Sequence, residues 1–199
     1  MKKMVVLLAA VFAIICIVPA YGQDAASGKT LILYYSKTGN TKAACEALQK
    51  ALGADIKEIK DLNSRDTKLG GLGGMLKTLL SMHTAIEPKK VDLSPYTTVI
   101  ISAPIWAAKF GLAMRTFVET NRFDGKNIII FITADSFIEE KYQAKHKALL
   151  AESGGNVTGY FQVQATDLVN KEKVPRTKEK IVEEALKLAP EMQKALAGK

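Results

Sequence analysis

The sequence is poor in the residues on which side-chain catalysis and metal binding depend. It holds only two histidines and two cysteines in 199 residues. Neither His83 nor His146 stands beside a nucleophile or a carboxylate motif, and both are expected on a surface or a helix face. Metal sites need clusters of Cys, His, Asp or Glu, and the sequence pattern shows none. The composition therefore argues against hydrolysis by side chains and against a metal centre.

Cysteine is too scarce for a disulfide framework. Cys16 lies in an apolar amino-terminal segment, where Ile15 stands in place of the small residue that lipoprotein signals carry before their cysteine, so lipidation is not expected. If that segment is removed, Cys45 is the only thiol left, and a single thiol cannot form an internal disulfide. Its place among alanines on a predicted helix favours a buried, unreactive thiol.

The chain also lacks an apolar run of full membrane-spanning length. The run from Met4 to Val18 has about 15 residues, against roughly 20 in a transmembrane helix. Two lysines precede it and Pro19-Ala20-Tyr21-Gly22 follows, which is the layout of a secretory signal. Retention of the segment as a membrane anchor is the alternative to cleavage. We predict export to the periplasm or the exterior and the following division: a signal peptide at 1–22, a short linker at 23–29 and one domain at 30–199.

Positive charge is in excess but is not gathered into a patch. The formal net charge is +8, or +6 without Lys2 and Lys3. Nucleic-acid binding needs a basic face with stacking aromatics, and that pattern is absent, so no nucleic-acid partner is expected. The charge is typical of solvated helix faces, and it also suits an acidic partner surface or anionic lipid.

Apolar runs of strand length alternate with helical patterns, which predicts an α/β fold in three layers: a doubly wound, five-stranded parallel sheet with helices on both faces. One segment, Lys68–Pro88, does not fit, because two Gly pairs precede its helical stripe; a packing helix is favoured there over a ligand lid. The predicted strands are Thr30–Tyr35, Ala54–Ile59, Thr97–Ser102, Asn127–Thr133 and Asn156–Gln164. The predicted helices are Asn40–Leu52, Gly111–Asn121, Ile138–Ser153 and Lys178–Leu196, the last with a break or kink near Pro190.

A hydroxyl-rich loop, Ser36-Lys37-Thr38-Gly39-Asn40-Thr41, joins the first predicted strand to the first helix. A helix amino terminus offers unpaired N–H groups and a partial positive charge, which suits a phosphate. The three hydroxyls can donate hydrogen bonds, the glycine can take a positive φ, and Asn40 can donate or cap the helix. The spacing is neither GxxxxGK[ST] nor GxGxxG. An ordinary helix cap is the alternative.

The loop resembles the phosphate loop of the flavodoxin family, whose pattern after the first strand is [ST]-x-T-G-x-T. Ser102-Ala103-Pro104-Ile105-Trp106, after the third strand, is similar to the second flavin loop of that family. The resemblance spans roughly Thr30 to the carboxyl terminus. It implies a flavodoxin-like fold with strand order 2-1-3-4-5 that binds FMN.

The expected FMN site combines three loops. Trp106, the only tryptophan, is expected to follow a strand end in a loop and to stack on the flavin ring. The third loop, 133–137, departs from the family pattern, because it has no glycine and Asp135 adds a negative charge. Ser36, Thr38, Gly39, Asn40 and Thr41 are assigned to the phosphate, Pro104, Ile105, Trp106 and Ala107 to the ring, and Thr133, Ala134 and Asp135 to its pyrimidine edge through backbone groups.

These observations favour an exported FMN-binding redox protein that passes electrons to or from a partner protein or a small acceptor. Flavodoxins that shuttle electrons are typically acidic, so the positive charge predicts acidic partners. Two alternatives stay open: an NAD(P)H-dependent quinone or flavin reductase, although no nicotinamide fingerprint is present, and a non-redox binding module that keeps the fold. Whether the protein is an FMN-dependent oxidoreductase stays open, and membrane contact is expected only if the signal is retained.

Overall fold

The computed structural model of the chain describes residues 29–63 and 83–197. Five strands form a parallel sheet in the spatial order β2-β1-β5-β7-β8, which is 2-1-3-4-5 when the parallel strands are counted along the chain. The expected α/β fold class is thereby confirmed. The strands are β1 (Thr30–Tyr34), β2 (Asp55–Glu58), β5 (Thr98–Trp106), β7 (Asn127–Ala134) and β8 (Asn156–Gln164).

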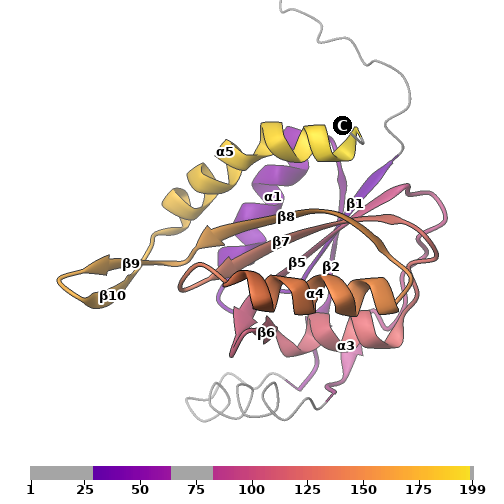
Figure 1. Cartoon of the computed structure of the whole chain (residues 1–199), viewed down its shortest axis with the longest axis horizontal. Helices are drawn as coiled ribbons and strands as arrows, with labels where there is room; N and C mark the ends of the chain where they lie inside the picture. The colour runs from indigo at the N-terminus through magenta and orange to yellow at the C-terminus, as the bar shows by residue number, and fades with distance from the viewer. Residues whose placement is uncertain (1–28, 64–82, 198–199) are drawn as a thin grey trace, which may run out of the picture.

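Helices cover both faces of this sheet, giving three layers (Figure 1). Helices α1 (Asn40–Leu52) and α5 (Lys178–Leu196) pack on one face. Helices α3 (Leu112–Thr120) and α4 (Glu140–Glu152) pack on the other. The helix α5 runs unbroken through Pro190, so the expected break near that residue is not seen.

The sheet divides the core into two apolar clusters. Leu31 and Leu33 of β1 contribute to the cluster under α3 and α4, whereas Ile32 and Tyr34 contribute to the cluster under α1 and α5. Successive side chains of a strand point to opposite faces, so a strand that is covered on both sides must be apolar at every position. This requirement explains the continuous apolar runs of the sequence.

The third parallel strand is longer than the pattern predicted. Strand β5 continues to Trp106 and turns back into β6 (Lys109–Phe110), which pairs with it antiparallel and adds a sixth strand to the sheet. The expectation that Trp106 lies in a loop after the strand is therefore wrong. Pro104 interrupts the apolar run, although Pro is tolerated at a sheet edge, and the pairing of β5 with β1 ends at Ser102.

Two short antiparallel pairs were also not predicted, because pieces of two to four residues carry little periodic signal. They join β3 (Lys60–Asp61) to β4 (Ile86–Glu87) and β9 (Thr166–Val169) to β10 (Glu172–Pro175). The β9–β10 pair projects from the domain beside the carboxyl end of β8 (Figure 1).

Several predictions fall on parts of the chain that the structure does not describe. The signal peptide at 1–22, the linker at 23–29 except Lys29, and most of Lys68–Pro88 lie outside the described residues. Among the helices of 29–63 and 83–197, none is long and apolar enough to cross a membrane.

The thiol of Cys45 lies in the core between α1 and β5. It is fully buried and donates a hydrogen bond to the hydroxyl of Ser102 over 3.1 Å. Burial, opposed in part by that hydrogen bond, raises the pKa of the thiol to about 12. Because the thiolate is the reactive form, the expected unreactive thiol is what the structure shows.

We predict that Cys45 of the folded protein resists an aromatic disulfide reagent at mildly alkaline pH, because the thiol is both covered and protonated. The measurement uses a Cys16→Ser variant, in which Cys45 is the only thiol, and follows the coloured thiolate that the reagent releases when it reacts. The same variant unfolded in urea serves as the control and should react at once. Rapid labelling of the folded variant would contradict the buried position.

Candidate functional site

The carboxyl ends of β1, β5 and β7 lie side by side, and the segments that follow them surround one pocket of about 230 Å³. In a doubly wound sheet this edge is where ligands bind. Of the residues predicted for the site, all line this pocket except Ser36, Gly39 and Ala107. The lining residues are Lys37, Thr38, Asn40, Thr41, Pro104, Ile105, Trp106, Thr133, Ala134, Asp135, Ala165, Thr166 and Pro175.

The amino terminus of α1 forms one end of the pocket. Its N-cap residue is Gly39, with φ of 92°, and not Asn40, which is the first helical residue. The left-handed φ favours glycine, and glycine brings no side chain to the first N–H groups of the helix. Ser36 supports the turn, because its hydroxyl accepts a hydrogen bond from the Gly39 N–H over 3.2 Å. With no acidic residue in the first turn, this end of the pocket suits an anion.

A lysine from the far end of the chain lies against this loop. A Cβ added to Gly39 would be 3.0 Å from Nζ of Lys178, at the start of α5. The ammonium group therefore lies beside the α1 amino terminus, where it adds positive charge to that of the helix dipole. Sequence reasoning missed Lys178, because only the packing of α5 against α1 brings the two helix starts together.

The hydroxyls of Thr41 and Thr133 join the first loop to the third. They are 2.7 Å apart in a hydrogen bond whose donor can be either atom. Both residues are almost fully buried, at 2% and 3% exposure, yet both line the pocket. Two hydroxyls carry two hydrogens and their mutual bond uses one of them. The accepting hydroxyl keeps its hydrogen for a second acceptor.

Trp106 forms the opposite wall of the pocket. Its ring is partly buried and meets Tyr35 edge to face, with centroids 5.9 Å apart and an interplanar angle of 83°. Burial, reinforced by the charge of Asp61, raises the pKa of the Tyr35 hydroxyl well above its ordinary value. The aromatic pair therefore stays uncharged at any physiological pH. The edge-to-face contact also fixes the plane that the indole presents to the pocket.

The third loop is supported from behind by the segment that follows β8. The Ala165 N–H donates to the carbonyl of Ala134 over 2.7 Å, and the Thr166 hydroxyl donates to the carbonyl of Asp135 over 2.6 Å. Phe137, the last residue of this loop, is 65% exposed and does not line the pocket. Ala165, Thr166 and Pro175 were missed, because they lie in or next to β9 and β10, which are too short to predict.

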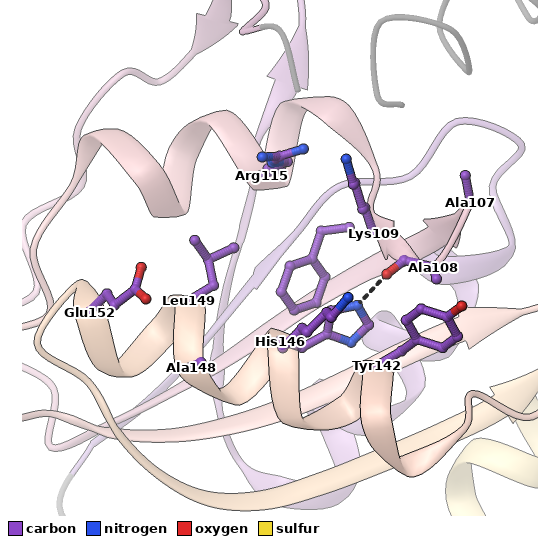
Figure 2. A pocket seen from close by; sticks show the side chains of 11 residues that line it. Ala107, Ala108, Lys109, Arg115, Tyr142, His146, Ala148, Leu149 and Glu152 are labelled. Atoms are coloured by element: carbon purple, nitrogen blue, oxygen red, sulfur yellow. Dashed lines mark hydrogen bonds between the residues drawn. The ribbon is translucent and has the colours of Figure 1, made fainter. Parts of the chain in front are cut away.

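A second pocket, of about 340 Å³, lies on the other side of the β5–β6 hairpin, between that hairpin, α3 and α4 (Figure 2). Ala107, assigned by sequence to the first site, lines this one instead. His146 also lines it and is only 4% exposed, so its expected position on a helix surface is wrong. His83, by contrast, is exposed and 2.7 Å from a carboxylate oxygen of Glu119. Within the described ranges no group of three or more His, Cys, Asp or Glu residues could hold a metal ion.

Comparison with known proteins gives one family match. The model of a family described as flavodoxin matches residues 29–156. No curated protein sequence matches the chain.

Solved structures share the fold. A flavoprotein of Bacteroides uniformis has a TM-score of 0.62 and 22% identity, over 78% of this chain and 96% of its own. A flavoprotein of Bacteroides eggerthii has a TM-score of 0.57 and 24% identity, over 82% of this chain and 98% of its own. A flavoprotein of Lactobacillus acidophilus, solved in complex with FMN, has a TM-score of 0.57 and 20% identity, over 68% of this chain and 93% of its own.

The Thr41–Thr133 bond predicts a specific double-mutant cycle. Thr41→Val leaves the buried hydroxyl of Thr133 without its partner and should lower the free energy of unfolding by about 1–3 kcal/mol. Thr133→Val should cost a similar amount, and the double variant should cost less than the sum of the two, because no orphan hydroxyl remains. Urea unfolding followed by circular dichroism measures all four proteins. Strictly additive losses would contradict a direct bond.

Proposed function

Since this chain belongs to the flavodoxin family, we propose that it is an FMN-binding electron-transfer protein that works outside the cytoplasm. The observation that carries the proposal is the convergence on one pocket of the uncapped α1 amino terminus, the Thr41–Thr133 pair and the Trp106 ring. A Lactobacillus flavoprotein of the same fold was solved in complex with FMN.

The residues at the α1 end of the pocket fit a phosphate. The N–H groups of the first helical turn, the hydroxyl of Thr38 and the free hydrogen of the Thr41–Thr133 pair supply neutral donors. Lys178 adds a positive charge beside the loop. FMN carries a terminal phosphate monoester with two negative charges near neutral pH, and both neutral donors and a nearby positive charge stabilise such an anion.

The residues at the other end fit a flat ring. Trp106 and Ile105 form an apolar wall at the end of β5, and the backbone of Thr133 and Ala134 ends the neighbouring strand β7 beside them. Bound FMN supplies the redox chemistry, accepting or donating electrons one or two at a time. At about 230 Å³ the pocket is smaller than the roughly 300 Å³ at which sites for whole drug-sized ligands begin. Part of the ring would then stay at the surface, where an electron partner can approach it.

Net charge supports an acidic partner. The formal charge of +6 without the two amino-terminal lysines would speed encounter with a negatively charged protein or small acceptor and would weaken that encounter at high salt. Export rests on the signal-like layout of the first 22 residues, and the work would then be done in the periplasm or outside the cell.

Cleavage of the signal gives a direct prediction. The protein recovered from the exported fraction of an expressing bacterium should begin at Gln23, because Ala20 and Gly22 stand at the small-residue positions before the cut. Intact-mass spectrometry together with sequencing of the amino-terminal peptide measures this. A full-length chain in the membrane fraction would support the anchor alternative instead.

The FMN proposal predicts different effects on FMN and on riboflavin, which lacks the phosphate. Lys178→Ala should weaken FMN binding about fivefold, for roughly 1 kcal/mol of charge–phosphate attraction, and Thr38→Ala should weaken it by about 1–3 kcal/mol through a lost hydrogen bond. Riboflavin affinity should stay within about twofold in both variants, because no phosphate contact is present to lose. Titration followed by quenching of the single tryptophan, Trp106, reports both ligands.

Lys194→Ala provides the matched control, because Lys194 lies on the same helix but in its last turn. It should leave both affinities unchanged. Equal loss of FMN and riboflavin in the Lys178 variant would contradict the phosphate assignment. Failure of the unmodified protein to bind FMN at micromolar concentrations would contradict the function and favour a non-redox binding module on this fold.

A further inference from the structure

The two-residue turn between β5 and β6 has a backbone that its sequence does not favour. Ala107 and Ala108 have φ of 47° and 58°, in the left-handed region that suits Asn and Gly. The second strand, β6, has only two residues, which pair Lys109 with Trp106 and Phe110 with Ile105 of β5. Alanine at both positions makes the turn strained. Contacts from elsewhere in the fold must therefore hold it.

His146 makes such a contact. Its Nε2 lies 3.0 Å from the carbonyl oxygen of Ala108 (Figure 2). A carbonyl can only accept, so Nε2 carries the hydrogen and Nδ1 accepts from the hydroxyl of Tyr160, 2.9 Å away. Both ring nitrogens are thereby used. The imidazole joins α4 and β8 to the outer side of the turn.

The ring of His146 is also packed as part of the core. It lies against Phe110, with centroids 4.6 Å apart, and stacks on Tyr160 with an interplanar angle of 7°. Its 4% exposure is low for histidine, a residue with two polar nitrogens. A side chain that is held through both ring nitrogens and packed against Phe110 can restrain the backbone that it touches.

We propose that His146 is a positioning residue that holds the Ala107–Ala108 turn and, through it, the indole of Trp106 in the wall of the candidate site. Trp106 is the last residue before the turn, so displacement of the turn moves the ring. The effect on FMN rests on the proposed function. The effect on Trp106 does not, because it concerns the cofactor-free protein as well.

The first test compares His146→Leu with His146→Gln in the full chain. Leucine keeps an apolar side chain against Phe110 but cannot donate to Ala108, whereas the glutamine amide can. Tryptophan emission and its quenching by acrylamide report Trp106 alone, because it is the only tryptophan. We expect a shifted emission and quenching increased about twofold or more in the leucine variant, with near-native behaviour in the glutamine variant. FMN affinity should fall about tenfold with leucine and recover with glutamine.

Ala108→Gly separates positioning from simple packing. Glycine takes a left-handed φ without strain, so the turn needs less support in this variant. We expect His146→Leu to change Trp106 quenching much less when Ala108→Gly is also present. Equal changes with and without Ala108→Gly, or native emission in the leucine variant, would overturn the proposal. Loss of FMN binding by every protein, the unmodified chain included, would count against the proposed function and leave the Trp106 result to decide this inference.

A pH profile keeps the test decisive if the leucine variant fails to fold. Burial lowers the pKa of His146, and the bond to Ala108 opposes that shift only in part, so the folded protein favours the neutral ring. The support of the turn should be complete above pH 6.5, the ordinary pKa. Below the lowered pKa of the folded protein, protonation puts a hydrogen on Nδ1, which can then no longer accept from Tyr160, and it places a charge in the core. The ring should then shift, and the turn with it. The groups around the imidazole are Lys109 of β6, Arg115 of α3, Tyr142, Lys145, Lys147 and Glu152 of α4, and Tyr160 of β8.

The expected profile is a change of Trp106 emission below pH 6.5 that disappears in His146→Gln. The control is His83→Gln, which removes the only other histidine of the chain and should leave the change in place. A profile that is unaltered in His146→Gln would overturn the proposal, because the groups around the imidazole would then account for it without the histidine.

Discussion

The pairing of β1 with β2 on one side and β5 on the other determines where everything else in the site can lie. β1 is the first strand in the described part of the chain and yet lies inside the sheet, so its carboxyl end adjoins that of β5. The pairing extends past the strand, because the Tyr35 N–H still donates to the Ser102 carbonyl over 2.9 Å. The loop at Ser36 therefore starts beside the extended end of β5. On the helix side of β5, the Cys45 thiol of α1 bonds the Ser102 hydroxyl, so the buried core extends up to this residue.

Much of this arrangement could be predicted from local patterns in the sequence. α1, β8 and α5 begin and end at the predicted residues, because Gly39 and Gly53 flank α1 and a capping Thr177 precedes α5. The parallel sheet follows from continuous apolar runs, which only a strand covered on both faces needs. The residues of the three loops could be predicted to converge because they follow strands whose carboxyl ends share an edge.

What the sequence could not show depends on contacts between distant residues. The position of Lys178 beside Gly39 follows from how α5 packs on α1, and no local pattern encodes that packing. The β5–β6 turn was missed because it has two alanines where a two-residue hairpin usually has Asn-Gly. The prediction for His146 was wrong because α4 has mostly polar residues, so the sequence pattern does not distinguish the buried histidine from its exposed neighbours.

These long-range contacts share one consequence for the ligand. The α1 loop is tied to the third loop by the Thr41–Thr133 bond, and the third loop is tied to the segment after β8 by the bonds from Ala165 and Thr166. These two loops are therefore held by contacts within the protein that do not depend on a ligand. A site organised before binding loses little conformational freedom when the ligand arrives. Preorganisation of this kind therefore contributes to how tightly the pocket can bind.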